Sequence, residues 1–202
     1  MKVSIILPYN KDRGYLKEAI ASAEAQTYKD IEIVPYKSDN GVSHNINQCV
    51  KRSTGTFIKL LADDDIMPPD CIQNMVSVME DNDFIHGKAM NFTNEGQKTI
   101  HEPSCKIPTL SRLLSKNHIH GGTTMYRRDI FERFGGYDET LWTGEELDFH
   151  LMLLSKGARI GYCDHVVYFY RIHSGQKSSN KTARGFREKR RLAIIAIRDR
   201  YR

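Results

Sequence analysis

Three short apolar runs, separated by segments of helical character, constrain the fold of this chain more than any other feature. The runs are Val3–Leu7, Ile31–Val34 and Phe57–Leu61. Their length and β-branched content favour buried strands, and the segments 15–26 and 42–52 between them are predicted helices. This alternation predicts an α/β domain with a Rossmann-like, mostly parallel central sheet flanked by helices.

Polar loops follow the predicted strands. They are Pro8-Tyr9-Asn10, 36–40 and Asp63-Asp64-Asp65. In sheets of this kind ligands bind beyond the carboxyl ends of the strands, so we expect the three loops to converge on one crevice.

The second half of the chain is less regular and predicts a smaller mixed region. We expect strands over 84–92, 97–101, 123–126, 159–162 and 166–170, and helices over 128–134 and 145–156.

The length of 202 residues suits one domain, with or without a short appendage. The cysteines are widely spaced and form no CxxC pair, so neither a zinc site nor a disulfide framework is expected. No apolar run approaches the roughly 18 residues of a membrane span, and Pro8 interrupts the N-terminal run too early for a signal peptide. These features predict a soluble, cytoplasmic protein with no transmembrane segment.

The net charge of +5 is concentrated at the C-terminus. Residues 181–202 carry nine Lys or Arg and two acids, whereas the remaining chain carries 21 bases and 23 acids. Because nucleic-acid-binding domains usually spread positive charge along a groove or face, no nucleic-acid partner is expected. The tail predicts a helix docked on the domain, a membrane-surface helix, or a connector to further domains of a longer protein.

Three consecutive carboxylates, Asp63, Asp64 and Asp65, follow the third predicted strand. Adjacent like charges repel, and a divalent cation relieves that repulsion. Oxygen ligands of this type suit Mg²⁺ or Mn²⁺ completed by substrate phosphates. The alternative is a solvated acidic loop with a helix-capping Asp.

Four segments in order resemble the family-2 glycosyltransferases with the GT-A fold. They are 3–10 with 15–20 and 25–28, then 55–65, then 134–139 with 144–148, and finally 170–175. The resemblance extends over about residues 3–178. It implies a single glycosyltransferase domain over 1–180, with a nucleotide-sugar-binding half (1–100), an acceptor and catalytic half (101–180), and a basic helix or connector (181–202).

The resemblance also implies roles for matched positions. The nucleotide would be bound by Pro8, Tyr9, Asn10, Asp39, Asn47, Asp63 and Asp64. The metal, Mn²⁺ or Mg²⁺, would be held in a DXD-type motif by Asp63, Asp64, Asp65 and His173. His173 is alternatively an ordinary histidine of a surface loop.

The acids Glu145, Glu146 and Asp148 open a predicted helix. Carboxylates at a helix N-terminus are stabilised by the helix dipole, and this structural role alone would explain their position. The alternative is a catalytic role: a general base must reach the acceptor hydroxyl, and the resemblance places it in the Glu145-Glu146 pair. We expect Glu146 to take the proton in a direct displacement with inversion.

Two further features are candidates for acceptor or sugar contacts. Gly121 and Gly122, preceded by His118 and His120, would allow close approach of a ligand to the backbone, or form an ordinary turn. Trp142 would stack on a sugar face or pack beside the helix that follows it.

The predicted function is therefore metal-dependent transfer of a hexose from a nucleotide sugar, UDP-linked, to a hydroxyl of a glycan or glycoprotein acceptor. The alternatives are a nucleotidyltransferase, a catalytically silent sugar- or nucleotide-binding module, and a nucleic-acid binder that uses the tail.

Overall fold

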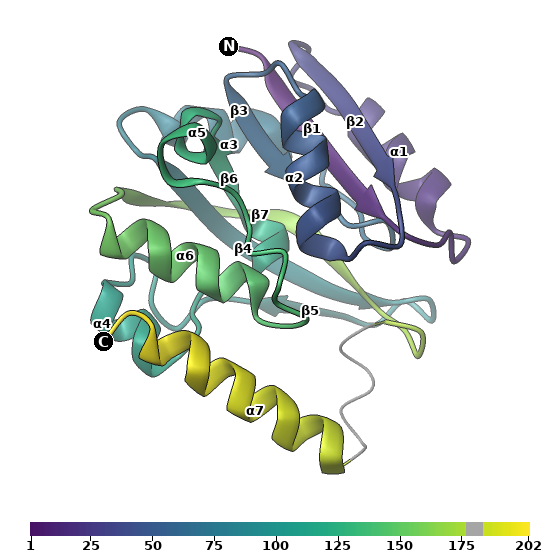
Figure 1. The fold of residues 1–202 in the computed structure, drawn as a ribbon. Helices are drawn as coiled ribbons and strands as arrows, with labels where there is room; N and C mark the ends of the chain where they lie inside the picture. The colour runs from purple at the N-terminus through teal and green to yellow at the C-terminus, as the bar shows by residue number, and fades with distance from the viewer. Residues whose placement is uncertain (177–183) are drawn as a thin grey trace.

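The computed structural model describes residues 1–176 and 184–202 (Figure 1). Within that part of the chain, seven strands form one sheet. The strands are β1 (Val3–Tyr9), β2 (Ile31–Lys37), β3 (Phe57–Leu60), β4 (Phe84–Thr93), β5 (Lys98–His101), β6 (Met125–Arg127) and β7 (Ile160–Ile172). The helices are α1 (Leu16–Glu24), α2 (Val42–Arg52), α3 (Cys71–Met79), α4 (Leu110–Ser115), the short 3-10 helix η1 (Gly121–Thr123), α5 (Asp129–Phe134), α6 (Glu145–Ser155) and α7 (Arg184–Asp199).

The sheet confirms the predicted α/β class. Its order is β2-β1-β3-β6-β4-β5, with β7 paired to the other edge of β4. β1 pairs in parallel with β2 and β3, and β4 pairs in parallel with β7, whereas β6 runs antiparallel to both β3 and β4. Since β5 also runs antiparallel to β4, the sheet is mixed, with the parallel strands on which the prediction rested in its first half.

Alternation along the strands sends apolar side chains to both faces of the sheet. One face packs against α1 and α3, through residues such as Ala19 and Met75. The opposite face packs against α2, α4, α5 and α6, through residues such as Ile46 and Leu151. Both faces are therefore covered, as expected for a sheet that contains parallel strands.

The strand β7 is continuous where the sequence pattern predicts two strands. The pairing of β4 with β7 shifts register on either side of Lys88, where Cys163 and Val166 are partners of consecutive β4 residues. The exposed pair Asp164 and His165 is accommodated in this irregularity, so the polar interruption bends the strand without ending it.

The described part of the basic tail is helix α7, and it docks on the domain. Ile197 is 1% exposed, and Ile194 and Tyr201 pack in the same apolar cluster as α6. The tip of Ile194 lies where a side chain on Gly144 would begin, so a glycine is required for this close approach. Of the three readings of the tail, docking fits the described residues; the predicted boundary at 180/181 and Lys181 lie outside them.

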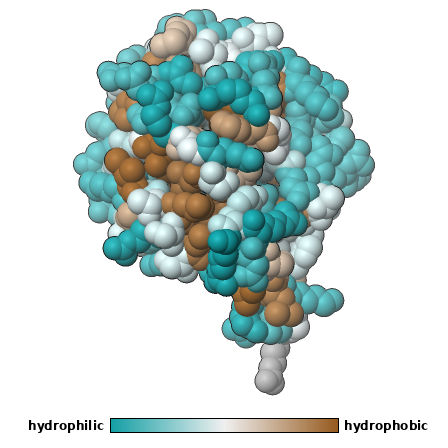
Figure 2. Space-filling model, turned by 60° about the vertical axis from the view of Figure 1, so that its left-hand side comes forward, coloured by the Kyte–Doolittle hydropathy of each residue, from teal (hydrophilic) through white to brown (hydrophobic). Residues whose placement is uncertain are grey.

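Leu192 and Ile195 of α7 are exposed. Figure 2 shows a small group of apolar side chains beside the grey segment, where α7 begins. Across residues 1–176 and 184–202, none of the helices combines the length and the apolar character needed to cross a membrane.

Candidate active site

A cleft of about 850 Å³ opens at the carboxyl end of β3, on the face of the sheet that α6 covers. Its volume is that of a site for a small-molecule or cofactor ligand. The walls come from the end of β3 and the loop after it, the start of α2, η1, the start of α6, the end of β7, and α7.

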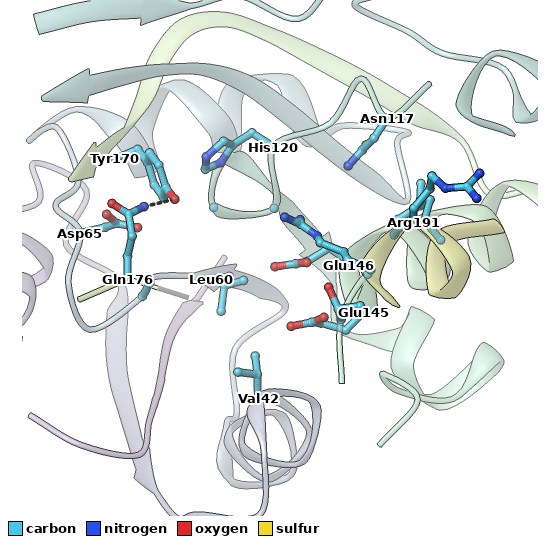
Figure 3. Close-up of a pocket in the computed structure, with 18 of the residues that line it drawn as sticks. Val42, Leu60, Asp65, Asn117, His120, Glu145, Glu146, Tyr170, Gln176 and Arg191 are labelled. Carbon is cyan, nitrogen blue, oxygen red and sulfur yellow. Dashed lines mark hydrogen bonds between the residues drawn. The ribbon is translucent and has the colours of Figure 1, made fainter. Parts of the chain in front are cut away.

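The cleft has two ends with different chemistry. We name them the acidic-loop end, formed by Asp64, Asp65, Tyr170 and Gln176, and the α7 end, formed by Asn117, Arg187, Arg190, Arg191 and Arg198. Figure 3 shows Asp65, Tyr170 and Gln176 on one side, Arg191 and Asn117 on the other, and Glu145 and Glu146 between them.

The three adjacent aspartates have different surroundings. Asp65 is 3% exposed and accepts hydrogen bonds from the Tyr168 hydroxyl at 2.7 Å and from the Arg171 backbone N–H at 2.8 Å. Asp64 lies 3.1 Å from the His173 Nε2, and Asp63 lies 3.4 Å from the Arg13 guanidinium. Asp65 therefore fixes the loop to β7, whereas Asp64 lines the cleft beside a histidine.

The side chain of Arg171 holds the acidic loop from behind. Its Nε donates to the backbone carbonyl of Asp64 at 2.9 Å, and its other nitrogens donate to Asn94 and pair with Glu18. The guanidinium also lies 4.4 Å from the centre of the Tyr15 ring. Because Arg171 is almost fully buried and planar, these contacts fix the loop in one position.

A divalent metal fits this loop with fewer protein ligands than the sequence predicted. Among the residues described, no three His, Cys, Asp or Glu side chains converge on one point. The two that meet are Asp64 and His173, and Mg²⁺ and Mn²⁺ sites of this type take one or two protein ligands with the remainder from substrate phosphates and water.

The pKa values of the carboxyl groups in the loop also favour a bound cation. Burial, with the neighbouring Asp64 charge as the second cause, raises the pKa of Asp63 to about 6 and that of Asp65 to about 7. Carboxylates with raised pKa values are those whose charge is poorly compensated, and a bound cation compensates it.

The paired glutamates open α6 at the centre of the cleft. Gly144 precedes them with a φ of +78°, a left-handed conformation that favours glycine. Glu146 lies against η1: a Cβ on Gly121 would be 2.8 Å from Glu146 Cγ and 2.9 Å from its Oε1. The absence of a side chain at Gly121 is thus what leaves room for the Glu146 carboxylate.

The third predicted acid, Asp148, has different surroundings. It accepts hydrogen bonds from the Tyr201 hydroxyl at 3.0 Å and from Arg200 at 3.3 Å, and it does not belong to the described lining of the cleft. Burial raises its pKa. These contacts anchor α7 to α6 and leave Asp148 no direct path to a substrate in the cleft, so we give it no catalytic role.

The helix η1 is held from below by Lys59, a buried residue of β3. Its ammonium donates to the carbonyl oxygens of Leu60 at 2.8 Å and Gly122 at 2.5 Å. Burial lowers the Lys59 pKa to about 8. A Cβ on Gly122 would collide with the Tyr168 ring at 2.3 Å, so both glycines of η1 are needed for packing on the floor of the cleft.

The histidines near η1 have separate positions. His120 lines the cleft, with its ring 4.9 Å from Tyr170, and burial lowers its pKa to about 4. His118 lies outside the lining described and contacts Ser104 at 2.9 Å. Trp142, also outside it, is exposed and packs edge-on against Phe186 of α7, with ring centres 5.6 Å apart.

The predicted nucleotide-binding residues lie beside the cleft rather than in its described lining. Pro8 and Tyr9 end β1 beside the end of β2, and Asn10 and Asp39 are exposed in the loops that follow. Asn47 is engaged elsewhere, since its amide bonds the backbone of Tyr137 and the Glu139 carboxylate.

Asn45 joins the first two loops, and the sequence prediction missed it. Its amide donates to the carbonyls of Tyr9 and Ser38, both at 2.9 Å, and accepts from the Ser38 hydroxyl. The available signal was an amide in the first turn of the helix that follows the second loop.

The sequence prediction also missed the α7 arginines as cleft residues, because their position depends on how α7 docks on the domain.

The comparison with protein families matches the segment that contains the acidic loop and η1. The sequence model described as Glycosyl transferase family 2 matches residues 36–135. Together with the relatives and solved structures below, this match supports a family-2 glycosyltransferase of the GT-A type. The resemblance inferred from its four segments is thereby confirmed.

A relative of this chain is an uncharacterized glycosyltransferase of Rickettsia conorii. The two are 28% identical, over 87% of this chain and 35% of the relative, so the chain spans about a third of that protein.

Solved structures confirm the GT-A fold. That of S. aureus TarS 1-349 in complex with UDP-GlcNAc has a TM-score of 0.74 at 18% identity, over 96% of this chain and 65% of that one. The mannosyltransferase PcManGT from Pyrobaculum calidifontis, in complex with GDP-Man and Mn²⁺, has a TM-score of 0.67 at 14% identity, over 98% and 64% of the two chains.

Proposed function

We propose that this family-2 chain transfers a hexose from a UDP-sugar to a hydroxyl group of a glycan or glycoprotein acceptor, with inversion and with the help of a divalent metal. The observation that carries the proposal is that one cleft contains both the Asp64 loop and the Glu145-Glu146 pair. Donor activation and proton removal therefore have candidate groups in a single site.

The acidic-loop end is suited to the donor diphosphate. Asp64 and His173 would hold the cation, which supplies charge neutralisation on the departing diphosphate when it is bound. The loops after β1 and β2, joined by Asn45, lie next to this end and are suited to the nucleoside. The solved relatives bind UDP-GlcNAc and GDP-Man, which supports a nucleotide-sugar donor.

Glu146 is suited to proton removal. Its carboxylate lies against Gly121, between the acidic-loop end and the α7 end of the cleft. A hydroxyl entering from the α7 end would reach Glu146 before it reaches the donor. The acceptor oxygen attacks the anomeric carbon as the bond to the diphosphate breaks, and its proton passes to the Glu146 carboxylate. Because attack and departure occur on opposite faces of the sugar, the anomeric configuration is inverted.

A catalytically silent sugar- or nucleotide-binding module is the main alternative, because binding alone requires only the acidic-loop end. It differs from an enzyme in one measurable property. A transferase hydrolyses its donor slowly when water replaces the acceptor, whereas a binding module releases it intact.

The test combines binding and turnover. Thermal unfolding is recorded with UDP, GDP, CMP and dTDP, with and without Mn²⁺, and release of UDP from UDP-sugars is measured in parallel. A ligand at 100 times its dissociation constant adds about 2.7 kcal/mol of stability. We expect the largest Mn²⁺-dependent shift with UDP; a larger shift with another nucleotide would refute the UDP assignment, and binding without hydrolysis would favour the silent module.

A further inference from the structure

One face of α7 presents a stripe of arginines to the cleft. Arg187, Arg190, Arg191 and Arg198 all line it. At 3.6 residues per turn these four positions lie within about 100° of the helix circumference. Ile194 and Ile197 lie on the same side of the helix and pack on the domain, so docking directs the stripe toward the cleft.

Much of this positive charge is not used to hold the fold together. Within residues 1–176 and 184–202, Arg187, Arg190 and Arg198 make no ion pair. The Nε of Arg198 is buried and has no hydrogen-bond partner in that part of the chain. A buried donor without a partner costs stability unless a ligand supplies the acceptor.

The contrast with Arg200 supports this interpretation. Arg200 belongs to the same basic segment, yet it pairs with Asp138 at 2.9 Å and Asp148 at 3.3 Å, away from the described lining of the cleft. Docking of α7 therefore uses Arg200, Tyr201 and apolar contacts, whereas the stripe contributes charge to the cleft.

We propose that the α7 end of the cleft binds a phosphate group carried by the acceptor. This inference rests on the proposed function, because it places the acceptor opposite the donor. Glu146 lies between the two ends, so a phosphate held by the stripe would position a neighbouring hydroxyl of the same molecule near the base.

Phosphate is the anion that fits the stripe best. Guanidinium groups bind phosphate oxygens through two parallel hydrogen bonds, and several guanidiniums together can contact the several oxygens of one phosphate group. Glu145 and Glu146 line the same cleft and repel weakly anchored anions, so a bound anion needs several strong contacts at once.

The test uses two phosphate probes and one neutral probe. The soluble probe is a glycerol phosphate oligomer, the lipid probe is a phosphatidylcholine vesicle that carries a polyprenyl phosphate, and the neutral probe is a dextran of similar length. Binding is measured with UDP and Mn²⁺ present at saturation, so that the donor diphosphate does not compete.

The matched variants remove two positive charges each from the same segment. Arg187→Gln with Arg190→Gln removes charge from the stripe; Lys189→Gln with Arg202→Gln removes it from positions outside the described lining. All four residues are exposed, so both double variants should fold. We expect the stripe variant to lower affinity for a phosphate probe by at least about tenfold, the equivalent of one lost charged hydrogen bond.

The control variant should change that affinity by less than about twofold at physiological salt, where exposed charges are screened. Binding of the soluble oligomer identifies a phosphate-bearing polymer as the acceptor class, and binding of the vesicle alone identifies a lipid-linked phosphate. Equal losses in the two variants, binding of dextran as tight as that of the oligomer, or no binding of either phosphate probe overturns the inference. Failure of the proposed function appears separately, as wild-type protein that shows no response to UDP.

Discussion

The acidic-loop end and the α7 end of the cleft are held by different kinds of contact. At the acidic-loop end, hydrogen bonds from Tyr168 and Arg171 fix Asp65 and the backbone of Asp64. At the α7 end, apolar packing of Ile194 and Ile197 against α6 places the helix along the cleft, and polar contacts to Asp148 hold only its C-terminal end. Hydrogen bonds fix atoms to within tenths of an ångström, as metal and diphosphate binding require. Apolar contacts tolerate more variation in the positions of the side chains that α7 places in the cleft.

The glutamates between the two ends provide the largest expected effect. Glu146→Gln keeps the shape of the side chain but removes its capacity to accept a proton. Transfer should fall by about 10²–10⁴-fold, the usual contribution of general-base catalysis. UDP binding, measured by thermal shift, should persist because Asp64 and the first two loops are unchanged.

Glu145→Gln is the matched control for that variant. Glu145 is 5% exposed and also opens α6, where the electrostatic benefit of its charge is about 0.3–1 kcal/mol. Its loss should reduce transfer less than loss of Glu146. A larger effect at Glu145 would reverse the assignment, and a retained anomeric configuration in the product would exclude the inverting mechanism.

Packing at the α7 end is tested by Ile197→Ala. Truncation of a buried Ile costs about 2–5 kcal/mol, so the free energy of unfolding should fall by an amount in that range. The measurement is urea denaturation. Leu192→Ala on the exposed side of α7 is the control and should change stability by no more than about 0.5 kcal/mol. Equal stability of the two variants would show that docking of α7 contributes little.

The acidic-loop end is tested by comparing Asp64→Ala with Asp65→Ala. Asp64→Ala should remove the Mn²⁺-dependent UDP shift of about 2.7 kcal/mol at 100 times the dissociation constant. Asp65→Ala should instead destabilise the protein without ligand by about 1–3 kcal/mol, because Tyr168 and Arg171 lose a buried acceptor. An unchanged UDP shift in Asp64→Ala would remove the metal site from this loop.

Acid should lower the stability of the protein through a histidine of α6, the helix that carries the glutamates. Burial lowers the pKa of His150 in α6 to about 3, below the value near 6.5 of an unfolded chain. Between these values the unfolded state binds more protons, so stability is complete above pH 6.5 and falls as the pH decreases, by at most about 1.4 kcal/mol per pH unit for this group. Denaturation at several pH values should give a shallower slope for His150→Phe, and identical slopes would contradict the shift.

The first half of the fold could be predicted because its signals are local. Apolar runs such as Phe57–Leu61 end at polar loops, and parallel strands bring those loops to one edge of the sheet. The roles of the three aspartates could not be separated in the same way. Their sequence context is nearly identical, and what distinguishes Asp65 from Asp64 is contact with Tyr168 and Arg171, which are more than a hundred residues away.

The position of the tail was likewise beyond the reach of the sequence. Its apolar positions suit a membrane surface as well as a protein surface, and the deciding contact is the approach of Ile194 and Ile197 to Gly144. Asn47 illustrates the same limit on a smaller scale. It resembles a nucleotide contact in sequence, yet its amide is engaged by the segment that contains Tyr137.

Arg171 sets the tolerance of the acidic loop to mutation. One guanidinium contacts three separate segments of the chain, through Asp64, Glu18 and Asn94. Lysine cannot replace it, because a single ammonium does not reproduce the planar arrangement of donors. Each partner makes one of several contacts and can vary while the others hold the loop. Sequence drift around the site should therefore accumulate in the partners, while Arg171 itself stays fixed.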